Sequence, residues 1–182
     1  MAEARRPEPV RFFTAVLAAD ARCLAAAAAL INERWGAPDL ASPHYPFAHT
    51  GYYAAETGPH IVRAFFSFPG GFDRELLPAR KNESNAMEKE LAAALADTGL
   101  ARPVNLDPGY LALEKIVLAS CKNFAHRLYL GQGVFGEVTL FYRGGRFEGA
   151  PWTFPDFLSG AYDAYFLQVR RALARELGKG HG

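Results

Sequence analysis

One predicted β-hairpin brings a carboxylate opposite two basic residues. The segment Gly131-Gln132-Gly133 separates two β-prone stretches and is typical of a hairpin reversal. A three-residue loop would place Arg127 opposite Glu137, and a two-residue loop would place His126 there instead. Directly opposed side chains in a hairpin lie within about 5.5 Å of each other. In either register, Glu137 therefore gains a basic neighbour.

These residue types could bind a small anion and act on it. Arg127 offers a planar guanidinium that suits carboxylate or phosphate, and Lys122 adds a point charge. His126 can exchange a proton near neutral pH. Glu137 and Asp107 could act as bases, orient the histidine, or bind a hard cation such as Mg²⁺. The alternative is a structural ion pair on a sheet surface, which uses the same residue types.

Further polar residues could complete such a site. Lys81 lies near the start of a predicted helix, where free N–H groups favour anions. Asn105 stands two residues before Asp107 and is not explained by turn geometry alone. Tyr53 and Glu56 belong to a loop and strand expected around residues 49–55, where only one of two adjacent tyrosines can face a given cleft. We assign no metal-ligand set among these residues.

Several of the polar residues also fit purely structural roles. Asn85, followed three residues later by Glu88, resembles a helix capping box. The run Asp107-Pro108-Gly109 has the preferences of a type II turn. Asp156 follows Pro155 and precedes an apolar segment, as a helix cap does.

The elements that must position these residues alternate between strands and helices. Residues 10–18 and 61–68 predict buried strands, and residues 115–121 predict a central strand covered on both faces. Asp20 is expected to cap a helix that stops at Gly36, and residues 73–94 predict a helix in two pieces interrupted near Pro78. A meander of three strands (126–130, 134–142 and from 146) and a helix over 159–177 follow.

This order predicts one α+β domain over residues 10–178, with disordered tails at 1–9 and 179–182. The first half predicts a ferredoxin-like βαββα core, which an antiparallel β-meander and a C-terminal helix would extend.

Composition limits the classes of partner. The 182 residues carry a net charge of +1, so broad electrostatic capture of nucleic acid or of an anionic membrane is not expected. No secretory signal is apparent, and the apolar stretch over residues 25–31 is shorter than the roughly 20 residues that span a bilayer. The two cysteines, Cys23 and Cys121, lack zinc-ligand spacing, and we expect free thiols in the cytoplasm.

Four long motifs resemble one bacterial family, the domain of unknown function 4416. They are Pro46-Phe47 with Thr50, Tyr52, Tyr53, Glu56 and Gly58; Arg102 with Asn105 to Tyr110; Leu118 to Asn123, continuing through His126–Leu130 to Glu137–Leu140; and Thr153 to Phe157. The resemblance extends from Val10 to Arg170 and implies no particular activity. The chain departs from the family pattern at Thr57, Cys121, Phe154 and Phe157, where we expect Met, Thr, Tyr and Tyr.

The leading hypothesis is an intracellular domain that binds a small anionic or phosphorylated ligand, with catalysis left open. The alternative is a noncatalytic interaction module with structural ion pairs, whose aromatic loop Tyr45–Tyr53 meets a protein partner. Convergence of Asp107, Lys122, Arg127 and Glu137 in one concave pocket would favour the ligand hypothesis. Their scatter over a convex sheet would favour the module. The oligomeric state is open in both cases.

Overall fold

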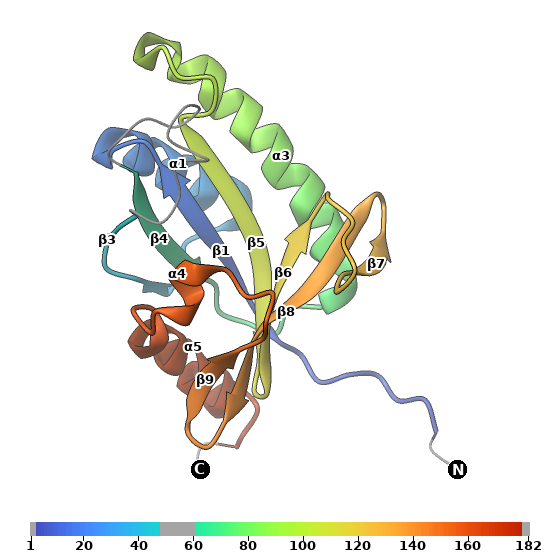
Figure 1. Cartoon of the computed structure of the whole chain (residues 1–182). Helices are drawn as coiled ribbons and strands as arrows, with labels where there is room; N and C mark the ends of the chain where they lie inside the picture. Colours follow the sequence, from blue (N-terminus) through green and yellow to red (C-terminus); the bar gives the residue numbers. More distant parts are fainter. Residues whose placement is uncertain (1–2, 48–60, 180–182) are drawn as a thin grey trace.

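The computed structural model describes residues 3–47 and 61–179 of the chain (Figure 1). In this part, nine strands form one antiparallel sheet in the order β2-β4-β1-β5-β6-β8-β7, with β3 paired to β4 and β9 paired to β8. The strands are β1 (Arg11–Ala18), β2 (Leu40–Ala41), β3 (Tyr45–Pro46), β4 (Val62–Ser67), β5 (Val104–Ala112), β6 (Lys115–Ser120), β7 (Leu128–Gly131), β8 (Val134–Arg143) and β9 (Arg146–Gly149). The helices are α1 (Ala21–Trp35), α3 (Leu77–Ala94), α4 (Pro155–Leu158) and α5 (Asp163–Glu176), with short 3₁₀ turns at Arg74–Leu76 and Ala96–Thr98.

The first half of the domain is the predicted ferredoxin-like core. Strand β1 lies between β4 and β5 and is antiparallel to both, while β2 pairs with the outer side of β4. The order β2-β4-β1-β5, with α1 and α3 as the connecting helices, is the βαββαβ arrangement. Strands β6, β8, β7 and β9 extend this sheet, and α5 closes the chain (Figure 1). The α+β class and the single sheet are therefore confirmed.

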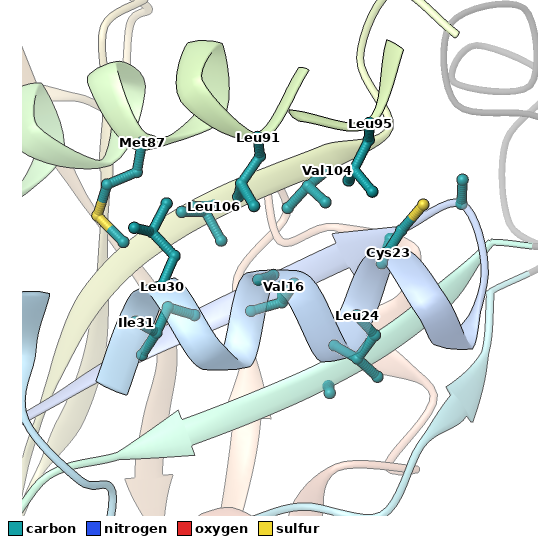
Figure 2. Close-up of a cluster of buried hydrophobic side chains, with 14 of the residues drawn as sticks. Val16, Cys23, Leu24, Leu30, Ile31, Met87, Leu91, Leu95, Val104 and Leu106 are labelled. Carbon is teal, nitrogen blue, oxygen red and sulfur yellow. The ribbon is translucent and has the colours of Figure 1, made fainter. Parts of the chain in front are cut away.

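Helices α1 and α3 cover one face of the sheet with an aliphatic core. Leu24 and Ile31 of α1 and Leu91 of α3 point toward Val16 and Leu106 of the strands (Figure 2). The predicted cap of α1 is confirmed, because the Asp20 carboxylate accepts a hydrogen bond from the Cys23 N–H at 2.7 Å. Gly36 ends the helix with a φ of 86°, a conformation that glycine adopts without strain.

The opposite face carries an aromatic core under α5. Phe65 of β4 makes ring contacts with Tyr162, Tyr165 and Phe166, at centroid distances of 4.7, 5.6 and 5.1 Å. Leu118 of β6 and Ala15 of β1 belong to the same core, so their side chains point to the α5 face. This assignment decides on which face the polar residues of the neighbouring strands lie.

Strand β5 overturns the turn predicted at residues 107–109. All of Val104–Leu111 pairs with β1, and Pro108 lies opposite Thr14. Strand β6, however, pairs with β5 only from Gly109 onward. Because proline has no N–H to donate, it is tolerated where a strand lacks a partner on one side. The two strands therefore diverge at the residues that precede Gly109 in β5 and follow Leu118 in β6.

The helix predicted in two pieces over residues 73–94 is present as a 3₁₀ turn at Arg74–Leu76 followed by α3 from Leu77, with Pro78 in the first turn of α3, where no helical N–H is needed. Two predictions of helix caps are wrong. Asn85 and Glu88 lie inside α3 and form no capping box. Asp156 lies within α4 rather than at its cap, where its carboxylate meets an arginine described below. The strand expected around residues 49–55 lies outside the described residues, and disorder of the two tails stays a prediction.

Candidate functional site

A pocket of about 400 Å³ opens on the α4 and α5 face, where β5 and β6 diverge. Its described lining comes from Asn105 and Asp107 of β5, residues 118–122 at the end of β6, Arg127 and Glu137 of the hairpin, and residues 154–157 around α4, together with Phe47, Arg63, Lys81 and Arg102. Asp107 pairs with Ala15 and Glu137 pairs with Leu118. Since opposed residues of antiparallel strands share a face, both carboxylates point to this side of the sheet.

Glu137 anchors one wall of the pocket, with a side chain that is 2 % exposed. Its Oε2 accepts hydrogen bonds from Arg127 Nε at 2.7 Å and pairs with His126 Nε2 at 3.0 Å, so both predicted basic neighbours contact it. Arg127 Nη1 also donates to Ser120 Oγ (3.0 Å) and to the Lys122 carbonyl (2.8 Å), which fixes the guanidinium against the end of β6. Glu137 Oε1 is buried and has no hydrogen-bond partner in the described part of the chain.

His126 contacts Glu137 but is not part of the described pocket lining. Its ring stacks on Trp152 with centroids 5.1 Å apart and an angle of 5° between the planes. Trp152 is held in turn by a hydrogen bond from its indole N–H to the Val138 carbonyl at 2.9 Å. The histidine is therefore placed to orient Glu137 and not to contact a ligand in the pocket.

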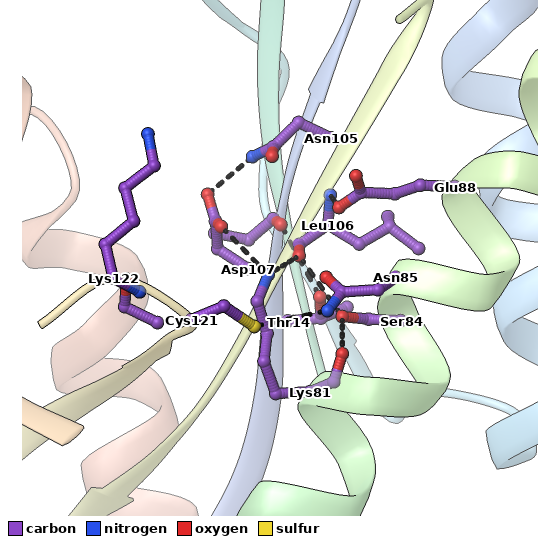
Figure 3. Close-up of polar contacts among 12 residues, drawn as sticks. Thr14, Lys81, Ser84, Asn85, Glu88, Asn105, Leu106, Asp107, Cys121 and Lys122 are labelled. Atoms are coloured by element: carbon purple, nitrogen blue, oxygen red, sulfur yellow. Dashed lines mark hydrogen bonds and ion pairs between the residues drawn. The ribbon is translucent and has the colours of Figure 1, made fainter. Parts of the chain in front are cut away.

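Helix α3 supplies polar groups to β5 at the point where β6 has left it. Lys81 Nζ donates to the Leu106 carbonyl (2.9 Å), and the Leu106 N–H donates to Glu88 Oε1 (2.8 Å). These contacts satisfy the backbone groups that a neighbouring strand would otherwise pair. Lys81 Nζ also lies 3.5 Å from Asp107 Oδ1. Figure 3 draws this ion pair as a dashed line. Lys81 thus reaches the pocket from the other face of the sheet and not as part of a helix N-terminus.

A chain of hydrogen bonds links Asp107 to a buried glutamate. Asn105 Nδ2 donates to Asp107 Oδ2 at 2.6 Å, and Asn105 Oδ1 accepts from Arg102. The Arg102 guanidinium also binds Glu88 Oε2 at 2.7 Å. Burial raises the pKa of Glu88 above its ordinary value, although the charges of Lys81 and Arg102 oppose the shift. This network fixes both Asn105 and Asp107 at the pocket wall.

A second buried ion pair closes the opposite side. Arg63 Nη2 lies 3.1 Å from Asp156 Oδ2, and both side chains are almost fully buried. The Tyr162 hydroxyl donates to the same Asp156 oxygen at 3.2 Å, and burial together with that carboxylate raises the pKa of Tyr162. The Arg63 guanidinium lies 5.1 Å from the ring centre of Phe47 and 5.8 Å from that of Phe157. The pair joins α4 to β4 in the pocket lining.

Lys122 differs from the other cations of the pocket. It is exposed and lies two residues after the end of β6 at Ser120. It makes no ion pair with any residue in 3–47 or 61–179. Figure 3 draws its side chain extended beside Asn105 and Asp107, with no interaction to the residues shown. Its ammonium group is therefore open to a partner from solution.

Six of the nine predicted site residues line this pocket: Lys81, Asn105, Asp107, Lys122, Arg127 and Glu137. His126 lies behind Glu137, and Tyr53 and Glu56 lie outside the described residues. Tyr45, the first residue of the proposed aromatic loop, contacts Phe65 and Tyr162 in the core.

Sequence reasoning missed the contributions of Arg63, Arg102, Asp156 and the aromatic residues Phe47, Phe154 and Phe157. The family-like motifs contain most of them, but nothing in the spacing brings Arg63 to Asp156, 93 residues away. Throughout residues 3–47 and 61–179, no three His, Cys, Asp or Glu residues lie close enough to hold a metal ion. A divalent cation as cofactor stays an untested expectation.

Comparison with known proteins gives one match. A family model described as "Domain of unknown function (DUF4416)" matches residues 8–173. No curated protein and no solved structure matches the chain. None of the helices in the described ranges has the length and apolar character needed to cross a membrane.

Proposed function

Because the chain belongs to the DUF4416 family, whose description names no activity, we propose from the pocket alone that the domain binds a small anionic or phosphorylated ligand. The observation that carries this proposal is the charge of the lining. Five basic residues (Arg63, Lys81, Arg102, Lys122 and Arg127) face three carboxylates (Asp107, Glu137 and Asp156) in one concavity. Concave sites with a few convergent polar groups are the usual form of a small-molecule site.

Among the described residues, Lys122 is the lining cation without a carboxylate partner, and Arg127 keeps one guanidinium nitrogen without a hydrogen bond. Asp156 pairs with Arg63, Asp107 pairs with Lys81, and Arg102 pairs with Glu88. Arg127 pairs with Glu137 through Nε and uses Nη1 for two further bonds, so Nη2 makes no hydrogen bond to the described residues. The ammonium of Lys122 and the Nη2 group of Arg127 are the donors that would hold the anion.

The carboxylates have separate roles in this proposal. Glu137 holds Arg127 in place, and His126 in turn orients Glu137. Asp107 is half-buried at the wall and would be the group that meets a hydroxyl or proton on the ligand, as an orienting residue or base. We propose binding as the function, with acid/base chemistry at Asp107 as its extension and with Glu137 and His126 as the residues that position the anion site.

We also propose that the domain acts in the bacterial cytoplasm. Cys23 is buried and Cys121 is exposed, and both are free thiols, as is usual in a reducing compartment. The bacterial origin follows only from the family resemblance.

A thermal-shift titration of the full chain tests the binding proposal. The probes are inorganic phosphate and a panel of phosphorylated small molecules, compared with chloride at equal ionic strength. A ligand at a hundredfold excess over its Kd should stabilise the fold by about 2.7 kcal/mol. The Lys122→Ala variant should bind at least about tenfold more weakly, because a hydrogen bond to a charged group contributes about 1.5–3 kcal/mol.

The matched control is Lys89→Ala, which removes an exposed lysine of α3 outside the pocket lining. This variant should bind the probes as the wild-type protein does. Equal losses in the two variants would mean that any anion binding is nonspecific, and the absence of stabilisation by every anion would refute the proposal.

A further inference from the structure

The pocket is lined by apolar residues as well as charged ones. Phe47, Phe154, Pro155 and Phe157 line it together with Leu118 of β6, and the rings of Phe47 and Phe157 lie beside the Arg63 guanidinium. A volume of about 400 Å³ falls in the range of roughly 300–1,000 Å³ that small-molecule sites occupy. An inorganic phosphate bound at Lys122 and Arg127 would leave most of this space unfilled.

Phe154 is an aromatic lining residue whose ring makes no ring contact within residues 3–47 and 61–179. Its side chain is 43 % exposed, whereas Phe157, three residues later, is 3 % exposed and packs on Phe65 and Tyr162. The other exposed aromatic residues in the described part, Phe124, Tyr129 and Trp152, each make a ring contact. Phe154 makes none there, although it lines a pocket.

The backbone fixes Phe154 at this position. Pro155 begins α4 and restricts the residue before it to an extended conformation, which Phe154 adopts with φ −58° and ψ 141°. The Phe154 carbonyl accepts hydrogen bonds from the N–H groups of Phe157 (3.0 Å) and Leu158 (3.2 Å). Asp156, held by Arg63, anchors the same turn. The backbone of Phe154 is thus fixed at the pocket, while its ring stays partly exposed there.

We infer that the anion bound at this site carries an aromatic or other flat apolar group, which stacks on Phe154 while its charge is held by Lys122 and Arg127. This inference rests on the proposed function and specifies its ligand class. Aromatic rings stack favourably beyond the area that they bury, and a residue whose backbone is already fixed has only its side-chain torsions left to order on binding.

Isothermal titration of the full chain with inorganic phosphate and with phenyl phosphate tests the inference. The two probes share the charged group and differ in the ring. We expect phenyl phosphate to bind wild-type protein at least about tenfold more tightly than inorganic phosphate. The Phe154→Ala substitution should weaken phenyl phosphate binding by roughly three- to tenfold and leave the affinity for inorganic phosphate unchanged.

Phe124→Ala is the matched control, since Phe124 is an exposed phenylalanine outside the pocket lining, and it should change neither affinity. Equal affinities of wild-type protein for the two probes, or an equal loss in both phenylalanine variants, would overturn the inference and leave the anion site intact. Binding of neither probe, or binding that is insensitive to Lys122→Ala, would overturn the proposed function as well.

Discussion

Replacing Glu137 with glutamine should destabilise the domain through its buried charge cluster. The Glu137 side chain is 2 % exposed, and its Oε2 holds both Arg127 Nε (2.7 Å) and His126 Nε2 (3.0 Å). The Glu137→Gln substitution removes the charge and leaves the Arg127 guanidinium without a carboxylate. The new amide N–H₂ can take either of two positions. In place of Oε2 it would meet two hydrogen-bond donors, and in place of Oε1 it would have no acceptor among the described residues. Removing one partner of a buried pair costs about 3–5 kcal/mol.

The lower end of that range applies here, since Arg127 and His126 retain about a tenth of their side-chain exposure to water. We therefore expect a loss of about 3 kcal/mol in the free energy of unfolding. With an m-value of about 2 kcal/mol/M, the urea midpoint would fall by about 1.5 M.

Urea unfolding of Glu137→Gln beside Glu148→Gln measures this loss. Glu148 lies on β9, and its pair with Arg146 at 2.9 Å is exposed, so the same chemical change there should cost less than about 1 kcal/mol. The slope of the transition should be unchanged in both variants, which would show that stability and not compactness has changed. Equal midpoint shifts in the two variants would refute the claim that Glu137 is structurally central.

Three further substitutions test other parts of the structure by urea unfolding. Asp20→Ala should cost about 1 kcal/mol at neutral pH by removing the cap of α1. The hydrogen bond from the Cys23 N–H lowers the pKa of Asp20 below 3.8, so the cap stabilises the fold above that pH. The deficit of the variant should therefore shrink as the pH falls through the lowered pKa, and a pH-independent deficit would contradict this origin. Gly109→Ala should cost at least about 3 kcal/mol, the upper end of the usual cost of overpacking, since a Cβ there would lie 2.4 Å from the Val117 carbonyl oxygen. An unchanged stability would mean that β5 and β6 can separate freely at this point. Arg11→Met should cost about 1 kcal/mol or less, because Asp39 and Glu176 are about a third exposed and can be hydrated once they lose the buried guanidinium, and a loss above about 3 kcal/mol would contradict this reasoning.

Local sequence patterns predicted the parts of the fold that depend on neighbouring residues. The glycine-rich reversal at residues 131–133 places Arg127 and His126 beside Glu137, since hairpin pairing is fixed by the turn itself. The apolar run of β6 is covered on both faces, with Ile116 and Leu118 in one core and Val117 and Ala119 in another. The hairpin contacts join residues that are close in the sequence, and the two-sided burial of β6 follows from the alternation of side chains along a strand.

The rest of the site depends on contacts between distant segments. Arg63 meets Asp156 because α4 folds back over β4, and Arg102 meets Glu88 across the connection between α3 and β5. Each residue alone fits a surface or capping role, and for this reason the sequence predicts a cap at Asp156. The capping box that the sequence predicts at Asn85 and Glu88 is wrong for the same reason. A helix-starting pattern occurs inside α3, where tertiary contacts and not caps satisfy its polar side chains.

Asp107-Pro108-Gly109 has the residue preferences of a turn but lies within β5, beside the pocket. In a turn these residues would reverse the chain, but β1 pairs with all of them and holds β5 straight. In a strand, alternate residues direct their backbone groups to the same side, so Pro108 and Leu106 face the side that β6 has left. Pro108 has no N–H to pair there, and Lys81 and Glu88 satisfy the groups of Leu106. Gly109 is the last point of close approach, since a Cβ would collide with β6. The same residues that imitate a turn therefore end the pairing of two central strands, and the opening that results holds Asp107, Lys81 and Lys122 around a common space.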